Sequence, residues 1–409
     1  MTQRFEVGVN YWPASSAMRW WRRFDASEVK RDFARIREAG GDLVRLFLLW
    51  EDFQPRPTSV SDRSLAHLVT VAEMARRHAL RIMPTLFVGH MSGANFVPEW
   101  ALGSAAPPGR FRVIANDRVV ERAMRNWYVD PLVFEAQALL ARECAAALAG
   151  HPALWGWDLG NENSNCCAPP TSDDGVRWLD RMASAIRSVD AACGITLGLH
   201  MEDLEDDRRI GPAEAANVCD VLCMHGYPIY TAWCRSPTDP ELVAFLTEVT
   251  RWLGGKDVLF AEFGAATRNG DPGAPTPSGA PTPAERGPSP LLGEDEAARY
   301  TERAFARLHA AGALGGLVWC YSDYDRAIWS EPPLDRAPHE RHFGLWRADG
   351  TPKPAVAALT EWSGRLHVAP PPLNWTEDDR KNFYTSPRDT LVRLYRAYTG
   401  TLPMARPLL

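Results

Sequence analysis

The chain has 409 residues, which suits one large domain or two ordinary ones and is ample for a buried core. Its formal net charge of -6 is mild, and the sequence has neither a basic stripe nor a basic terminal tail. The sequence therefore gives no electrostatic reason to expect a nucleic acid or an anionic membrane as a partner. A neutral or weakly charged substrate suits this composition better.

The N-terminus and the cysteines indicate a cytoplasmic protein. Residues 1–4 are polar and the first apolar run, from Phe5, already resembles a strand, so we expect no signal peptide. No apolar run approaches the ~20 residues that a membrane span requires. The eight cysteines are scattered through the chain, and Cys219 and Cys223 lack a second matching pair, so free thiols are expected rather than a zinc site.

The first 90 residues alternate between strand and helix patterns. Strands are expected at residues 5–12, 42–50 and 80–88, and helices at residues 26–39 and 61–79. Ser61 is a candidate cap for the second helix. This alternation predicts parallel strands joined by right-handed helical crossovers.

The same alternation continues to residue 366. Further strands are expected at residues 154–163, 195–200, 221–227, 258–263 and 317–321, and further helices at residues 131–149, 174–192, 240–253, 294–311 and 354–366. Eight strands predict a closed (β/α)8 TIM barrel over residues 1–366. Residues 367–409 are expected to form a short C-terminal extension, with a helix at residues 387–398, packed on the barrel.

Three connecting segments are longer than an ordinary loop between a strand and a helix. Residues 89–130 and 322–350 exceed the usual length, and such segments commonly carry function or wall a site. Residues 267–292 are rich in proline, glycine, serine and threonine and follow the seventh strand. They would form either a lid over the catalytic face or an insertion without catalytic consequence.

Two of the expected strands deliver a carboxyl group to their C-terminal ends. The stretch LWGWDLGNEN at residues 154–163 breaks from an apolar run into Gly160, Asn161 and Glu162. The stretch VLFAEFGA at residues 258–265 carries Glu262 in the same kind of setting. Because the C-terminal ends of parallel barrel strands converge on one face, the two carboxyls are expected to meet there.

In these motifs the chain resembles clan A of the glycoside hydrolases, and family 5 in particular, over roughly residues 5 to 366. The resemblance implies that Glu162 is the acid/base and Glu262 the nucleophile of a retaining β-glycosidase, which works by double displacement without a metal or cofactor. Two carboxyls can divide these tasks if their surroundings hold their pKa values apart.

The resemblance also assigns substrate-binding roles to neighbouring strand ends. Arg45, inside an apolar run, would lie against the nucleophile and favour its ionised form. Asn161 would donate a hydrogen bond to the sugar 2-hydroxyl. His90, in the stretch GHMSG, would contact the sugar in the -1 subsite, the one that the nucleophile attacks.

Three more candidates come from the ends of the sixth and eighth strands. His225 and Tyr227 are two positions apart and should point the same way, the tyrosine hydroxyl contacting the nucleophile. Trp319 resembles the family's hydrophobic platform beneath the sugar. His339 and Glu340 would either bind a sugar hydroxyl or form a surface ion pair.

The expected partner is an oligosaccharide or glycoside, with β-mannosides as first choice and β-glucosides as second. The long segments favour a pocket for chain ends or short oligosaccharides over an open groove for polymers. Two alternatives stay open at this point. One is a metal-dependent barrel hydrolase using His90, His200 and His225, and the other is a sugar-binding barrel without turnover. Sugar, linkage, transglycosylation and oligomeric state are left open by the sequence.

Overall fold

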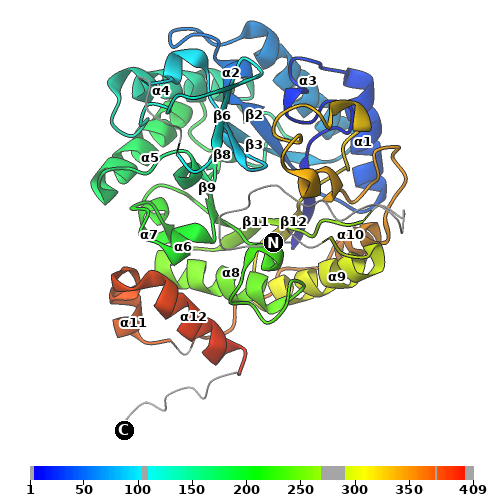
Figure 1. Ribbon diagram of the computed structural model, residues 1–409, viewed down its shortest axis with the longest axis vertical. Helices are drawn as coiled ribbons and strands as arrows, with labels where there is room; N and C mark the ends of the chain where they lie inside the picture. The colour runs from blue at the N-terminus through cyan, green and yellow to red at the C-terminus, as the bar shows by residue number, and fades with distance from the viewer. Residues whose placement is uncertain (1–3, 104–108, 269–290, 374, 401–409) are drawn as a thin grey trace.

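Eight parallel strands form a closed barrel in the computed structural model, which describes residues 4–103, 109–268, 291–373 and 375–400 (Figure 1). In ring order the strands are β1 (Glu6–Tyr11), β2 (Leu43–Leu49), β3 (Arg81–Val88), β8 (Trp157–Asn161), β9 (Ile195–His200), β10 (Leu222–His225), β11 (Val258–Phe263) and β12 (Gly315–Val318). Pairing of β12 with β1 closes the ring. The predicted (β/α)8 barrel is confirmed.

Helices lie around the outside of the barrel between successive strands (Figure 1). They are α1 (Ala26–Glu38), α3 (Asp62–Arg77), α4 (Pro131–Ala147), α5 (Ser172–Arg187), α7 (Pro212–Ala216), α8 (Glu241–Gly254), α9 (Glu294–Ala310) and α10 (Ala357–Trp362). The expected cap of α3 is present, because the Ser61 side chain accepts a hydrogen bond from the Ser64 amide. The short α7 and the turns α2 (Trp50–Phe53) and α6 (Glu202–Glu205) were not anticipated, since four or five residues show no helical periodicity.

Two strands begin two or more residues away from their expected starts. β8 begins at Trp157, and Leu154 makes only one isolated bridge, to Ile82. β12 occupies residues 315–318 rather than 317–321, because it begins with two glycines that the apolar pattern did not include. A Cβ atom at Gly315 would lie 2.3 Å from the Glu6 carbonyl oxygen, so glycine permits the close approach of the closing strand.

The barrel interior changes in character along its axis. Near the N-terminal ends of the strands the interior side chains form an apolar cluster, consisting of Leu43, Met83, Cys223, Leu259, Ala261 and Leu317. Closer to the C-terminal ends, Arg45 and Asp158 are fully buried and charged. The interior is therefore apolar at the N-terminal ends of the strands and polar at their C-terminal ends, so the functional residues lie at the C-terminal face.

Segments outside the ring cover that face and one side of the barrel. Residues 89–130 contain a second small sheet, formed by β4 (His90–Met91), β5 (Ala94–Phe96), β6 (Arg112–Ala115) and β7 (Arg118–Val120). The extension carries α11 (Glu377–Lys381) and α12 (Pro387–Tyr398), which lie outside the ring near α6 and α8 (Figure 1). The division of the chain at residue 366 stays a prediction.

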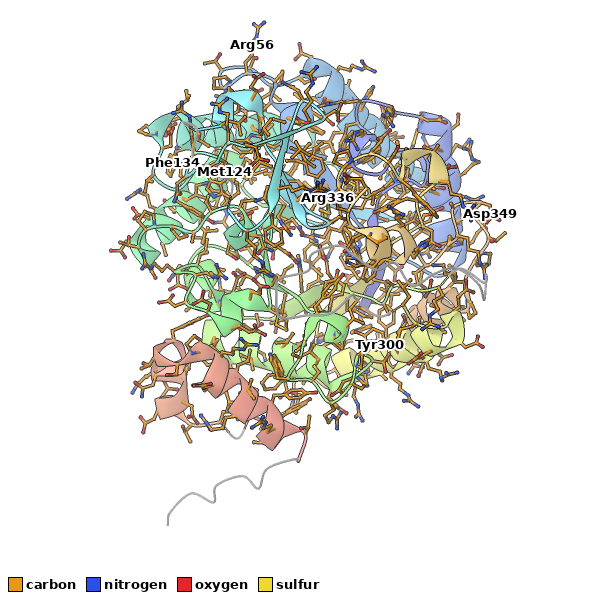
Figure 2. All side chains as sticks on the ribbon, in the orientation of Figure 1. Arg56, Met124, Phe134, Tyr300, Arg336 and Asp349 are labelled. Carbon is orange, nitrogen blue, oxygen red and sulfur yellow. The ribbon has the colours of Figure 1, made fainter. Side chains whose placement is uncertain are left out.

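Side chains fill the space between the barrel and the helices, whereas Arg56 and Asp349 project outward at the edges (Figure 2). All eight cysteines are free. Among the described residues, no helix combines the length and the apolar character that crossing a bilayer would demand. Most of the expected lid at residues 267–292 lies outside the described residues, so that expectation is not addressed.

Candidate active site

The end of β8 is bent so that Asn161 and Glu162 enter the mouth of the barrel. Gly160 has φ +150°, and a Cβ atom there would lie 2.1 Å from the Asn163 side-chain oxygen, so the bend requires glycine. Glu162 itself adopts the left-handed conformation, with φ 50° and ψ 48°, and its amide donates to the Gly198 carbonyl at 2.9 Å. A non-glycine residue in this region is uncommon and is characteristic of functional sites.

Glu262, at the end of β11, is held by two donors. Arg45 Nη1 lies 2.5 Å from Glu262 Oε1, and the Tyr227 hydroxyl donates to Glu262 Oε2 at 2.8 Å. Arg45 is fully buried, and its Nη2 also pairs with Asp158 at 2.6 Å. A buried guanidinium between two carboxylates is compensated in charge and fixed in direction, so Glu262 is presented in one orientation.

Asn161 connects this ion-pair network to the loop that carries His90. Its side-chain oxygen accepts from Arg45 Nη2 at 3.0 Å, and its Nδ2 donates to the His90 carbonyl at 3.0 Å. Since an amide nitrogen carries two donor hydrogens, one remains for a substrate hydroxyl.

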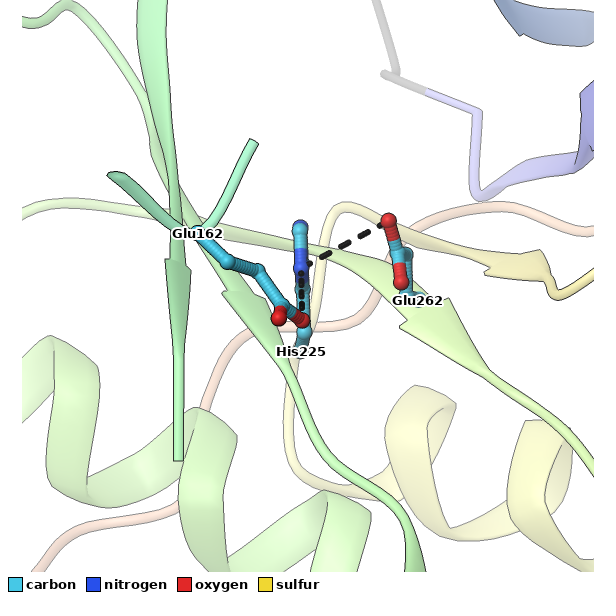
Figure 3. A group of neighbouring side chains, drawn as sticks. All are labelled: Glu162, His225 and Glu262. Atoms are coloured by element: carbon cyan, nitrogen blue, oxygen red, sulfur yellow. Dashed lines mark hydrogen bonds and ion pairs between the residues drawn. The ribbon is translucent and has the colours of Figure 1, made fainter. Parts of the chain in front are cut away.

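Three histidines surround Glu162. His225 Nδ1 lies 3.1 Å from Glu162 Oε1 and 3.6 Å from Glu262 Oε1, so its ring stands between the two carboxylates (Figure 3). His90 Nε2 and His200 Nδ1 each lie 3.9 Å from Glu162 Oε2. One oxygen of each glutamate and His225 Nδ1 all lie within 4.8 Å of one another.

The surroundings act differently on the two carboxyl groups. Burial raises the pKa of Glu262, and His225, Arg45 and Tyr227 oppose that rise. Burial also acts to raise the pKa of Glu162, but the combined effect of His200, His225 and His90 lowers it below its usual range. Burial by itself would lower the pKa of His200, yet Asp203, Glu162 and Glu202 raise it. The lowered pKa of Glu162 and the raised pKa of His200 together favour a resting site in which the proton of this pair is on His200.

The same residues bear on whether a metal ion could bind. Glu162, His225 and Glu262 offer donor atoms close enough to share a cation. However, the Arg45 guanidinium lies 2.5 Å from Glu262 and would repel one. His90 Nδ1 is 2.8 Å from the Asn95 side-chain oxygen and His200 Nε2 is 2.9 Å from Ser164 Oγ, so each of these rings turns only its other nitrogen toward Glu162.

His90 and Trp319 complete the set of candidate residues. The His90 ring lies 4.4 Å from that of Phe111, which the small sheet brings to the pocket. Trp319 follows β12 and is 4% exposed. Its ring centroid lies 5.7 Å from that of Phe47 in an edge-on arrangement, and the Arg45 guanidinium lies over the Phe47 ring. The structure thus brings all the site residues expected from the sequence to one face of the barrel.

Some polar neighbours of the site had not been anticipated. Ser164 Oγ donates to Asp203 Oδ1 at 2.5 Å behind His200, and Asn165 Nδ2 donates to Glu162 Oε2 at 3.0 Å. The polar run that follows Glu162 was a usable signal for Ser164 and Asn165. Asp203 gave no signal, because it belongs to the short α6.

Known proteins with the same fold resemble the chain in sequence as well. No family model matches it. It is 26% identical over 250 residues to "Putative mannan endo-1,4-beta-mannosidase 5" of Oryza sativa subsp. japonica, a match that covers 54% of the chain and 48% of the rice protein. The matched region is therefore about half the length of that relative.

Several solved structures cover most of the chain, and two of them illustrate the similarity. The exo-β-1,4-mannosidase of Opitutaceae bacterium strain TAV5 is 28% identical with a TM-score of 0.68, over 88% of this chain and 59% of that one. The GH5_18 protein of Streptomyces cattleya, in complex with GlcNAc, is 23% identical with a TM-score of 0.76, over 98% and 92% of the two chains. A variant of the latter is solved with Manβ1-4GlcNAc. The chain thus resembles glycoside hydrolases of the family 5 type in fold and, more distantly, in sequence, as its motifs predicted.

Proposed function

We propose that the protein is a retaining β-glycosidase that hydrolyses short β-mannosides. The observation that carries the proposal is the approach of the Glu162 and Glu262 carboxylates, with oxygens within 4.8 Å of each other. Retaining enzymes hold their carboxyl groups about 5–5.5 Å apart, whereas inverting enzymes need roughly 6.5–9.5 Å to admit a water molecule. The spacing therefore supports a covalent glycosyl-enzyme.

The two glutamates would act in sequence. Glu262, oriented by Arg45 and Tyr227, attacks the anomeric carbon while Glu162 protonates the leaving oxygen. In the second step Glu162 accepts a proton from water, which displaces Glu262 from the sugar. His200, whose Nδ1 lies 3.9 Å from Glu162 Oε2, supplies and stores the proton that Glu162 gives and takes.

The choice of β-mannosides is supported by the similar proteins. The rice protein and the Opitutaceae protein are both named as mannosidases, and the Streptomyces cattleya variant is solved with Manβ1-4GlcNAc. A disaccharide of that kind, with mannose at its non-reducing end, is our first candidate for the natural substrate. β-Glucosides remain second, since the sugar 2-hydroxyl is distinguished by pocket shape.

The test is hydrolysis of nitrophenyl β-glycosides by the wild type, Glu262→Ala, Glu162→Gln and Glu162→Ala. We expect β-mannoside turnover above β-glucoside turnover, and a loss of at least about a thousandfold in kcat for Glu262→Ala. Added azide should yield the α-glycosyl azide with Glu262→Ala and the β-glycosyl azide with Glu162→Ala, because each variant leaves a different face open. Glu73→Ala, on the outer surface of α3, is the matched control and should keep full activity.

Three outcomes would contradict the proposal. Loss of activity on adding a chelator would support a metal-dependent hydrolase instead. An azide product of the same anomeric configuration from both variants would rule out the assigned roles. Binding of Manβ1-4GlcNAc without hydrolysis of any glycoside would establish the sugar-binding barrel instead.

A further inference from the structure

A buried carboxylate joins three loops above the barrel. Glu340 belongs to the turn Pro338–His342 in the segment after β12 and is 9% exposed. Its Oε2 accepts from Ser92 Oγ at 3.1 Å, and its Oε1 accepts from the Tyr230 hydroxyl at 3.2 Å. His339 Nε2 lies 3.4 Å from the same Oε1. Ser92 comes from the segment after β3 and Tyr230 from the turn after β10.

This carboxylate lies close to both sides of the proposed site. Ser92 is two residues beyond His90, whose ring faces Glu162 at 3.9 Å. On the other side, the Tyr230 ring lies 5.5 Å from that of Tyr227, whose hydroxyl donates to Glu262. Two residues therefore separate Glu340 from each of the two groups that would act on the substrate. They are Ser92 and His90 on the side of Glu162, and Tyr230 and Tyr227 on the side of Glu262.

The chemistry of Glu340 suits a sugar hydroxyl. Burial acts against its charge, yet the hydrogen bonds from His339, Ser92 and Tyr230 lower its pKa, so it is an anion at neutral pH. A carboxylate has about four acceptor positions, and these three contacts leave about one for a ligand. Two of its present partners are hydroxyl groups, the same group that a sugar would offer.

The bridge also sets the shape of the site. The loops that Glu340 joins follow β3, β10 and β12, so their contact spans the C-terminal face of the barrel. The leaving group has to lie beside Glu162, which protonates it. The sugar that stays on Glu262 lies on the side of Tyr227, whose ring packs against that of Tyr230, a hydrogen-bond partner of Glu340.

We propose that Glu340 binds a hydroxyl group of the substrate's terminal sugar and closes the pocket at that end, so that single sugars are removed from the non-reducing end. This inference rests on the proposed function and adds a specificity-determining residue to it. Of the two sequence-based alternatives for Glu340, the inference takes sugar binding, with the ion pair to His339 supporting the carboxylate.

The first experiment compares the wild type with Glu340→Gln and Glu340→Ala on nitrophenyl β-mannosides that are intact or lack the 3-, 4- or 6-hydroxyl. We expect the wild type to lose about 10–100-fold in kcat/KM on removal of one of these hydroxyls, as for a hydrogen bond to a charged group. On the intact glycoside, both variants should lose about as much kcat/KM as the wild type loses on the deoxy substrate. On the deoxy substrate itself they should lose little more. Equal losses in wild type and variants would overturn the inference.

The second experiment follows β-1,4-mannotetraose labelled at its reducing end. At early times the wild type should release only labelled mannotriose, and Glu340→Ala should also give labelled mannobiose by internal cleavage. Labelled mannobiose as an early wild-type product would refute the closed pocket. Glu331→Gln, in the same segment but paired with Arg23 at 3.0 Å, is the matched control and should behave as wild type.

Failure of the inference is distinguishable from failure of the proposed function. If the wild type cleaves mannosides while Glu340→Gln matches it in kcat/KM and in products, Glu340 has no such role and the glycosidase stands. If the wild type cleaves no glycoside, the proposed function and the inference about Glu340 are both refuted. Thermal unfolding of each variant separates a lost contact from a lost fold, and the near-isosteric Glu340→Gln serves where Glu340→Ala does not fold.

Discussion

His200, which lies beside Glu162, lowers the pKa of the Glu162 carboxyl group through its positive charge. His200 Nε2 lies 2.9 Å from Ser164 Oγ, which donates to Asp203, and its Nδ1 faces Glu162 Oε2 at 3.9 Å. Asp203 Oδ2 also accepts from the His200 backbone amide at 3.0 Å. The imidazole is fixed from two sides, so its positive charge is held at a constant distance from the carboxyl group.

Replacing His200 should change the pH dependence of catalysis. The charge on His200 lowers the pKa of Glu162, so His200→Asn should raise that pKa and keep the acid protonated to higher pH. The basic limb of the pH profile of kcat/KM should therefore shift to higher pH. The measurement is nitrophenyl β-mannoside hydrolysis from pH 4 to pH 9.

The control for this experiment lies at the opposite end of β8. His151 precedes the strand, far from Glu162 along it, so His151→Asn should leave the profile unchanged. A basic limb that stays in place or moves downward in His200→Asn would show that His200 does not set the charge around Glu162.

At the scale of elements, α4 depends on one aspartate for its start. Asp130 precedes Pro131, and its carboxylate accepts from the Leu132 amide at 3.0 Å and the Val133 amide at 3.2 Å. These amides have no partner within the helix, and the negative charge also complements the helix dipole. The same arrangement begins α1, where Asp25 accepts from the Ser27 amide at 2.8 Å.

Removing the α4 cap should destabilise the protein without changing the site. Asp130→Ala should lower the free energy of unfolding by about 1 kcal/mol, since two amides lose their acceptor. Asp130→Asn keeps an acceptor oxygen and should lose less. Urea unfolding of both variants provides the measurement, and equal stability of Asp130→Ala and wild type would contradict the assignment.

At the scale of the molecule, a buried aspartate joins the two ends of the barrel. Asp32, on α1, accepts hydrogen bonds from the Tyr11 hydroxyl of β1 at 2.9 Å and from the Tyr321 hydroxyl after β12 at 2.6 Å. Burial raises its pKa to about 6, although both tyrosine hydroxyls act to lower it. The closing seam of the barrel therefore contains a group that titrates in the mildly acidic range.

This group makes stability depend on pH in a direction opposite to that of an ordinary aspartate. Because the folded-state pKa lies above the unfolded value of about 3.9, the stabilisation is complete below that value and is lost as the pH rises through about 6. Relative to Asp32→Asn, the wild type should gain up to about 3 kcal/mol in unfolding free energy between pH 7.5 and pH 4. Paired urea titrations at the two pH values measure this, and a constant difference would contradict it.

Part of this protein followed from the sequence alone. The βα alternation predicted the barrel, and the abrupt change from apolar strand to Gly160, Asn161 and Glu162 located the acid/base candidate. Periodicity and strand-end polarity are local properties, so they can be read residue by residue. The resemblance to family 5 rested on these same short motifs.

Other features required the tertiary structure. The bridge from Glu340 to Ser92 and the contact of Ser164 with His200 join segments far apart in the sequence, and the closed barrel sets their distance in space. The long segments were recognised as irregular, but no pattern within them indicated which loop they would meet. Local periodicity fixes which elements form, whereas the charges, distances and pocket shape that decide specificity depend on packing between distant segments.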